Sequence, residues 1–317
     1  MQTVNRINRE NAEGEGSIKR VVAICGSTGG IGEALFRAYA KKDVHFLLAG
    51  RRLNVLLRLK KDAESLGATA ETDAFDIRDR SALEAWSLKA ALRGAERFIL
   101  CSGVSASVEP LQFAKQQIGD GTRDEIWYLP ERLEDLNREL EVNAVGNILA
   151  ANSFARAVLQ LRAEKGTTPD DEDVKPIQIA FIASLAALTG LPGSPGYSAS
   201  KSALRTYGEA LRRLLQKQQI GVTVIFPGYV ESDMSRRYIG AKPWLCSADH
   251  AAQKIKAAIE SAKPEYAFPW ILAFGIRLLN LLPRWAQNFF LKGFFFTVEP
   301  DQESKVERIN RPRAGDE

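Results

Sequence analysis

The stretch that decides the fold is KRVVAICGSTGGIGEALFRAYAKK, residues 19–42. Its apolar run up to Cys25 is typical of a buried strand, and the pattern after the glycines is typical of a helix. Gly26 permits a tight turn, Gly30 lets a pyrophosphate approach, and Gly32 lets the helix pack closely on the strand. The N–H groups at the start of such a helix attract phosphate. The stretch therefore predicts a dinucleotide site.

The alternation of strand and helix continues along the chain. Further strands are expected at 44–49, 69–75, 97–101, 177–183, 222–226 and 266–268, and helices at about 53–66, 79–93, 131–163 and 247–262. This pattern predicts an α/β fold of the Rossmann type, a doubly wound parallel sheet of about seven strands flanked by helices. Two stretches interrupt the alternation, an expected loop or small lid at 104–130 and a solvated acidic loop at 164–176.

Composition excludes several classes of protein. The 317 residues carry a net charge of only +4, which gives no case for a nucleic-acid partner. Three cysteines, far apart in the chain, and two histidines suggest neither a disulfide framework nor a metal site. Residues 1–17 are polar, are expected to be a disordered leader, and lack the apolar core of a signal peptide. We therefore expect a cytoplasmic protein.

A second group of residues has the pattern of a proton-transfer site. Tyr197 and Lys201 are four residues apart in a helical stretch, which places them on one face of that helix. Ser184 directly follows the expected strand at 177–183. A neighbouring ammonium favours tyrosinate, so we expect a lowered pKa for Tyr197 and proton exchange with a carbonyl or carbinol oxygen. The Tyr–Lys spacing is common by chance, so this hypothesis depends on the glycine turn.

The end of the second expected strand predicts which cofactor is preferred. A carboxylate there would bind the ribose hydroxyls of NAD, but Arg51 and Arg52 occupy the place. Guanidinium groups suit the 2′-phosphate of NADP, and Ser27 is expected to add a hydroxyl to that phosphate. Asp76 follows the third strand, where it could bind the adenine amino group or cap the next helix.

Together these residues make the chain resemble the short-chain dehydrogenase/reductase family over about residues 19–262. The resemblance implies hydride transfer between nicotinamide and a carbonyl or alcohol carbon. It places the catalytic set on Asn143, Ser184, Tyr197 and Lys201. It places the cofactor-binding set on Gly26, Ser27, Gly30, Ile31, Gly32, Arg51, Arg52, Asp76, Ile77, Tyr197, Lys201, Pro227, Gly228, Val230 and Ser232. In it Lys201 also binds the nicotinamide ribose and lowers the pKa of Tyr197, and Asn143 kinks its helix and holds a water.

The chain departs from the family pattern at a few positions. Cys25 replaces a threonine, Cys101-Ser102 replaces Asn-Ala, and Ser232 replaces a threonine. The first two changes put local hydrogen bonds that support the sheet in doubt, and none of the changes removes a catalytic group. The glycine turn also fits the spacing of sugar-nucleotide epimerases, but Pro227-Gly228 and the close Ser–Tyr spacing argue against that version.

The pattern as a whole favours an NADPH-preferring carbonyl reductase. An NAD-linked alcohol dehydrogenase is the competing enzymatic hypothesis, which Arg51 and Arg52 disfavour. Two hypotheses outside this enzyme class are a cofactor-sensing binding protein, which would generally lack the Tyr–Lys pair, and a membrane-surface scaffold with vestigial activity.

The segment 265–298 is unusually apolar and is expected to form an extension to a catalytic domain at 18–264, before a charged tail at 299–317. Pro283 and Gly293 divide it into pieces shorter than the roughly 20 residues that span a bilayer. Two amphipathic helices lying on a membrane surface fit this pattern, as do a dimer interface and a cover over the substrate cleft. A lipophilic or lipid-linked substrate suits each of these, and we expect a homo-oligomer.

Overall fold

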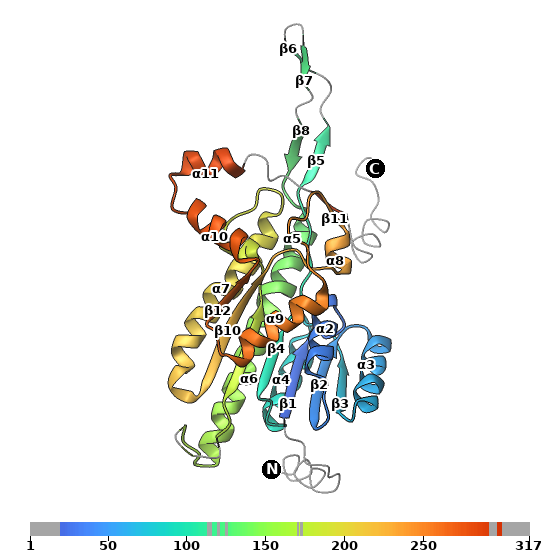
Figure 1. Ribbon diagram of the computed structural model, residues 1–317, viewed down its shortest axis with the longest axis vertical. Helices are drawn as coiled ribbons and strands as arrows, with labels where there is room; N and C mark the ends of the chain where they lie inside the picture. Colours follow the sequence, from blue (N-terminus) through green and yellow to red (C-terminus); the bar gives the residue numbers. More distant parts are fainter. Residues whose placement is uncertain are drawn as a thin grey trace, which may run out of the picture.

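The computed structural model describes residues 20–112, 116–118, 121–123, 126–169, 171, 174–291 and 297–299. Its centre is a parallel sheet with the strand order β12-β10-β9-β4-β1-β2-β3 (Figure 1). The strands are β1 (Arg20–Cys25), β2 (Val44–Gly50), β3 (Thr69–Ala74), β4 (Arg97–Leu100), β9 (Ile177–Ile182), β10 (Ile220–Pro227) and β12 (Glu265–Phe268). The predicted seven-stranded, doubly wound α/β fold is confirmed.

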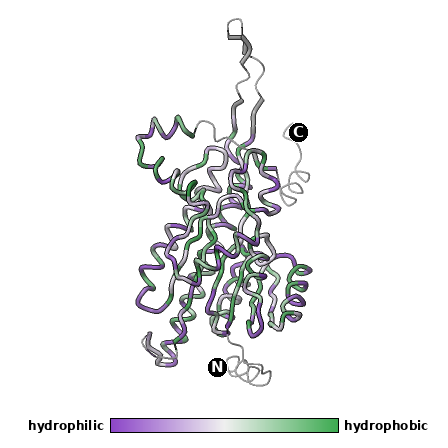
Figure 2. The backbone as a smooth tube through the Cα atoms, in the orientation of Figure 1, coloured by the Kyte–Doolittle hydropathy of each residue, from purple (hydrophilic) through white to green (hydrophobic). Residues whose placement is uncertain are grey.

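Helices cover both faces of the sheet. One face carries α2 (Gly30–Tyr39), α3 (Leu53–Ser65) and α9 (Ala248–Glu260), and the other carries α4 (Arg80–Leu92), α6 (Asn147–Glu164) and α7 (Pro195–Leu215). On the second face the rings of Phe98 and Phe154 stack with their centroids 4.1 Å apart. Because both faces are covered, most of the strands are predominantly hydrophobic and do not alternate with polar residues (Figure 2).

The strand order fixes where a ligand can bind. The chain runs from β1 to β2 on one side, whereas β4 pairs with the other side of β1. In open parallel sheets, ligands bind beyond the carboxyl ends of the strands at such a reversal. The turn after β1, the loop after β4 and the chain after β9 all begin at this edge.

The expected helix at 131–163 is interrupted. It consists of α5 (Leu133–Glu139), a π-helix η1 (Leu140–Gly146), and then α6. The widened turn lies in the middle of this segment and contains Asn143. Such π-turns are frequent at functional sites.

The expected loop at 104–130 instead contains antiparallel strands. Strand β5 (Glu109–Gln112) pairs with β8 (Ile126–Leu129), and β6 (Gln116–Ile118) pairs with β7 (Gly121–Arg123). Both pairs extend from the carboxyl edge of the sheet (Figure 1). Three or four residues are too few for hydrophobic alternation to predict a strand reliably, which explains why the sequence pattern missed them.

The expected strand at 266–268 is present and takes up the first residues of the expected apolar extension. Glu265–Phe268 forms β12 and pairs with β10, so these four residues belong to the sheet. The helices α10 (Trp270–Leu279) and α11 (Arg284–Leu291) follow, and β13 (Thr297–Val298) pairs with β11 (Tyr238–Ile239). Among the described residues, no helix has both the length and the apolar character needed to cross a bilayer. The expected leader and almost all of the charged tail lie outside the described residues.

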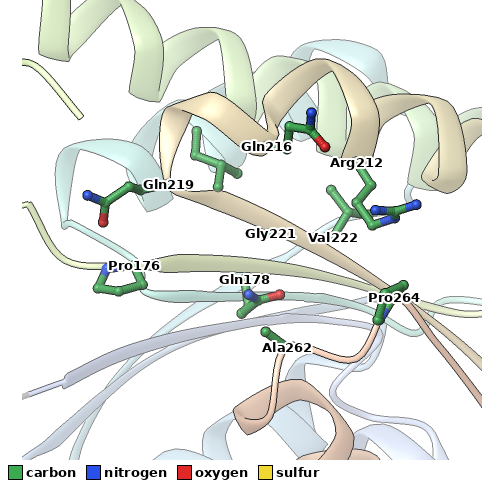
Figure 3. A pocket seen from close by; sticks show the side chains of 10 residues that line it. Pro176, Gln178, Arg212, Gln216, Gln219, Gly221, Val222, Ala262 and Pro264 are labelled. Carbon is green, nitrogen blue, oxygen red and sulfur yellow. The ribbon is translucent and has the colours of Figure 1, made fainter. Parts of the chain in front are cut away.

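One pocket of about 310 Å³ lies at the opposite edge of the sheet (Figure 3). Gln178 and Gly221, near the amino ends of β9 and β10, line it together with Arg212 of α7. Its position at the amino ends of the strands separates it from the catalytic candidates, which lie beyond the carboxyl ends.

Candidate active site

The structure brings the predicted proton-transfer residues together. Ser184 follows β9, and Tyr197 and Lys201 lie in the first two turns of α7. The Ser184 side chain is close enough to the Tyr197 phenol to lower its pKa, and it accepts the backbone N–H of Ala186 at 3.2 Å. The Lys201 Nζ atom lies 5.7 Å from the centroid of the Tyr197 ring. Two hydroxyl groups can therefore contact one substrate oxygen beside an ammonium.

Lys201 is held away from water. Its side chain is buried, and Nζ donates a hydrogen bond to the carbonyl oxygen of Ile182 at 3.0 Å. Burial disfavours the charged form and lowers the pKa of Lys201 to about 8. The lysine is therefore protonated at neutral pH and can lose its proton in mildly alkaline solution.

Tyr197 differs from the expectation of a lowered pKa. Burial raises the pKa of its phenol to about 12, and the negative charge of Glu139 acts in the same direction, although the nearby Ser184 hydroxyl opposes them. The lysine does not offset this shift, because with a pKa of about 8 its ammonium has lost its charge before the phenol titrates. Tyr197 thus keeps its proton throughout the neutral range, which suits donation to a carbonyl oxygen.

Asn143 links the π-helix to the loop that follows β4. It is completely buried, and its Oδ1 accepts the backbone N–H of Val104 at 2.7 Å. Its Nδ2 donates to the Val104 carbonyl at 2.9 Å and to the Ser200 hydroxyl at 3.0 Å. A Cβ on Gly103 would lie 3.3 Å from Lys201 Nζ and 3.4 Å from Asn143 Oδ1. The loop after β4 is therefore packed directly against the lysine, whereas the water expected at Asn143 stays a prediction.

The glycine turn fits a dinucleotide because two of its glycine positions leave no room for a side chain. Gly26 has a φ of +83°, and a Cβ there would lie 2.7 Å from the Ser102 nitrogen. A Cβ on Gly32 would lie 2.1 Å from the carbonyl oxygen of Gly26. Helix α2 begins at this turn with no side-chain cap, so its first N–H groups face the space a phosphate would take. Ile31 is part of this first turn.

The segment after β10 lies against the same turn. A Cβ on Gly30 would lie 2.9 Å from the Cβ of Ser232. Gly228 donates its N–H to the carbonyl oxygen of Phe268 at 2.7 Å, which fixes the segment after Pro227, and Val230 is buried. Ser232 caps the short helix α8 (Asp233–Arg236). The structure thus places 227–232 next to the start of α2.

The expected phosphate contact of Ser27 needs correction. Its side chain is completely buried, and its hydroxyl donates to the Ala49 carbonyl at 3.1 Å, so it supports the turn from inside. Thr28, which the sequence pattern did not single out, lies nearer the two arginines. Its carbonyl accepts a hydrogen bond from Arg52, and its hydroxyl would lie 2.9 Å from a Cβ on Gly50. The sequence feature that could have identified Thr28 is its position in the glycine turn, one residue after Ser27.

Asp76 does not cap the next helix. That role belongs to Asp79, which accepts the Ala82 N–H at 3.1 Å. Asp76 accepts the backbone N–H of Arg78 at 2.9 Å and two bonds from its guanidinium. Although burial acts in the opposite direction, these bonds keep the pKa of Asp76 below its usual value. Asp76 also lies 4.0 Å from Arg51, at the expected adenine end of the site.

The neighbouring Ile77 has a structural role in the site. Its side chain is buried, and a Cβ on Gly146 would lie 2.7 Å from its Cγ1 atom. The segment between β3 and α4 is therefore packed against the π-helix that carries Asn143.

The cysteines that replace family residues still connect β1 and β4. Cys101 Sγ donates to the carbonyl oxygen of Cys25 at 3.0 Å, and Cys25 Sγ lies 3.5 Å from the Ser102 hydroxyl. Burial raises the pKa of the Cys25 thiol to about 11, so it remains neutral. The cysteines therefore still provide local contacts between the ends of β1 and β4.

Comparisons with known proteins agree with this geometry. A family model described as short chain dehydrogenase matches residues 20–242. An uncharacterized oxidoreductase from Myxococcus xanthus is 27% identical over 266 residues, which cover 83% of this chain and 93% of that protein. The hydroxysteroid 11-beta-dehydrogenase 1-like protein B of Xenopus laevis is 26% identical over 286 residues, covering 88% of this chain and 85% of that protein.

Solved structures share the fold. A short-chain type dehydrogenase/reductase from Mycobacterium ulcerans superposes with a TM-score of 0.63 at 16% identity, covering 87% of this chain and 98% of its own. At this identity, the likeness concerns the fold alone.

Proposed function

Because the chain belongs to the short-chain dehydrogenase/reductase family and is an NAD(P)-dependent oxidoreductase, we propose that it prefers NADPH and reduces the carbonyl group of a lipophilic substrate. The observation that carries the cofactor preference is the pair of arginines at the end of β2. Arg52 reaches back to the carbonyl of Thr28 in the glycine turn, and Arg51 lies near Asp76. The two residues directly after Gly50 are both arginines, so this position offers no carboxylate to bind a ribose diol.

The chain's own residues provide the proton chemistry of this reaction. When bound, a reduced nicotinamide supplies the hydride. The hydroxyl groups of Ser184 and Tyr197 lie close together, so both can hold the carbonyl oxygen, and Tyr197 donates its proton as negative charge develops there. The Lys201 ammonium, protonated below a pKa of about 8, stabilises that charge. Asn143 keeps the loop after β4 in place beside it.

The apolar substrate class is supported by what lies next to Ser184. The residues after it form the short helix η2 (Leu185–Leu188), which contacts α10. Asn280, at the end of α10, donates a hydrogen bond to the Leu188 carbonyl oxygen at 2.6 Å. The apolar extension is thus attached to the segment that carries the catalytic serine. A relative named for a hydroxysteroid, an apolar alcohol, is consistent with this class.

We expect the double change Arg51→Ala with Arg52→Ala to weaken NADPH binding by roughly ten- to a hundredfold. Each charge-assisted bond to the 2′-phosphate contributes about 1.5–3 kcal/mol, and part of this is retained by Thr28. NADH binding should change little because NADH lacks that phosphate. Titration of the purified protein with each cofactor, followed by nicotinamide fluorescence, measures both affinities.

The matched control is Arg58→Ala on α3, which removes an exposed arginine paired with Glu33 at 2.7 Å. This variant should bind both cofactors like the wild type. Equal wild-type affinities for NADPH and NADH would contradict the proposed preference and favour the NAD-linked alcohol dehydrogenase. Binding of neither cofactor would contradict the enzymatic site itself.

We further propose that the apolar extension lies on an anionic membrane surface. Trp270, Phe274 and Leu278, at helical spacing on α10, are exposed to more than half of their full extent. Trp285 and Phe289 of α11 are 75% and 72% exposed. The segment 269–291 contains two arginines and no acidic residue. Exposed tryptophans with basic neighbours are typical of helices that bind the lipid interface.

We expect Trp285→Ser with Phe289→Ser to lower the vesicle affinity by at least tenfold, because each large side chain contributes about 1.5–3 kcal/mol on burial. Sedimentation with phosphatidylcholine vesicles, with and without phosphatidylglycerol, measures this affinity. The control, Leu214→Ser, removes an apolar side chain that is 74% exposed at the far end of α7. If the double variant binds vesicles normally but loses an oligomer in size-exclusion chromatography, the surface is a subunit interface instead.

A further inference from the structure

Glu139 is a buried carboxyl group beside the proton-transfer residues. It is the last residue of α5, one helical turn before Asn143, and its side chain is completely buried. Its Oε1 accepts the backbone N–H of Ala106 at 2.6 Å. Its Oε2 has no hydrogen-bond partner among the described residues. An ionised carboxylate with one unpaired oxygen is costly to bury, whereas a protonated one carries no charge.

A second carboxyl group faces the same point. A Cβ on Gly196 would lie 2.6 Å from Glu139 Oε2 and 2.9 Å from Glu131 Oε2. Glu131 is the better stabilised of the two as an anion, because it accepts the Gly196 N–H at 2.8 Å and contacts the Ser194 hydroxyl at 3.4 Å. Two adjacent carboxyl groups do not both ionise readily, so a proton is expected on Glu139.

The other charged or titratable groups near Glu139 lie on α5 and α7. Asp135 and Arg138 lie on the same helix and form an ion pair at 3.4 Å. Helix α7 contributes Tyr197 and Lys201, each of which is within electrostatic reach of Glu139. The proton on Glu139 therefore controls whether a negative charge lies beside the catalytic pair.

Glu139 also holds the loop that packs on the lysine. Asn143 binds Val104, and Glu139 binds Ala106 from one helical turn away. On its other side, the Ala106 carbonyl accepts the Ser194 hydroxyl at 2.6 Å. The loop is thereby fixed between α5 and the start of α7.

We propose that Glu139 is a positioning residue of the proton-transfer site, which works as a neutral carboxylic acid and places a negative charge beside Tyr197 and Lys201 when it loses its proton. The geometry agrees with the electrostatics, since burial, together with Glu131 and Asp135, raises the pKa of Glu139 to about 8. The ionised form favours the protonated forms of both partners. The link to catalysis rests on the proposed function, whereas the protonation state of Glu139 does not.

The first test compares the free energies of unfolding of wild type and Glu139→Gln between pH 5 and 8.5, without cofactor or substrate. The unfolded chain releases the Glu139 proton near its ordinary value of 4.5, but the folded protein keeps it until about pH 8. Over this window the unfolding constant of the wild type should therefore rise, relative to that of Glu139→Gln, about tenfold per pH unit. The neutral glutamine, which mimics the protonated form, abolishes this dependence.

The control is Glu134→Gln, on the same helix but partly exposed near Arg132. It should track the wild type at every pH. If the ratio of the unfolding constants of wild type and Glu139→Gln is independent of pH, the proposal is overturned, because Glu139 then ionises normally in the folded protein. Should Glu139→Gln fail to fold, Glu131→Gln serves instead. Removing the charge of Glu131 lets Glu139 ionise at a lower pH. The pH range over which the unfolding constant rises should therefore end at a lower pH than in the wild type. An unchanged range would contradict the proposal.

The second test measures the charge effect on the lysine. The ¹³Cε resonance of Lys201, assigned with Lys201→Arg, should titrate near pH 8 in the wild type. In Glu139→Gln its midpoint should fall by roughly one unit, because an anion close by no longer favours the ammonium. An unchanged midpoint would show that Glu139 has only a structural role. Neither test uses turnover, so a failure of the proposed reductase activity is distinguished from a failure here.

Discussion

Tyr197→Phe should reduce the rate of carbonyl reduction by roughly a hundred- to ten-thousandfold, the range typical of a lost general acid. The variant removes only the phenolic hydroxyl, which lies near Ser184, and keeps the ring beside Lys201. NADPH binding should be retained because the glycine turn is untouched. Single-turnover oxidation of bound NADPH, with a ketone found by screening, measures the rate separately from product release.

Tyr207→Phe is a matched control on the same helix. Tyr207 is partly buried, and its ring packs edge-on against Phe181 with centroids 6.1 Å apart. Its loss should leave the rate near that of the wild type. If Tyr197→Phe turns over normally, another group donates the proton. If the wild type itself shows no turnover, the result favours the hypotheses of a membrane-surface scaffold and of a cofactor-sensing protein.

Gly32→Ala should abolish cofactor binding and destabilise the fold by about 1–3 kcal/mol or more, because the new methyl group would overlap backbone rather than a movable side chain. Its Cβ would lie 2.1 Å from the Gly26 carbonyl oxygen, so α2 must shift away from β1. Thermal unfolding and NADPH titration measure the two effects.

Gly29→Ala tests whether this sensitivity is local. Gly29 has a φ of −80°, which alanine adopts readily, and its Cβ would meet only the Gly26 carbonyl oxygen at an ordinary 3.5 Å. Its melting temperature should stay close to that of the wild type. Equal stability of the two variants would mean that α2 and β1 are not as tightly packed as the turn indicates.

The fold was predictable because its determinants are local. A buried parallel strand is apolar throughout, and the glycine turn follows β1 within one short stretch, so both are visible without knowledge of tertiary contacts. The residues at the carboxyl ends of β9 and β10 and at the start of α7 could be placed together once the parallel order was inferred. The family and the fold are confirmed.

What the sequence missed depends on burial and on contacts between distant segments. Ser27 and Thr28 are neighbours with similar side chains. They differ in the folded protein because the Ser27 hydroxyl is hydrogen-bonded to the Ala49 carbonyl oxygen. The pKa of Tyr197 is set by the loss of water around it, which spacing to a lysine does not report. Glu139 lies in a helical stretch where an acidic residue normally suggests a solvated face, yet the fold buries it completely.

The position of β12 has a consequence for how the protein is made. This strand is the last of the sheet in the chain and lies at its edge, where it pairs only with β10. The rest of the sheet can therefore form while the ribosome is still adding the C-terminal residues, since chains fold from the N-terminus during synthesis. The apolar helices α10 and α11 emerge after η2 and β12, the two elements that α10 contacts. Late emergence shortens the time for which these helices are exposed on an unfinished chain, when aggregation is the main hazard.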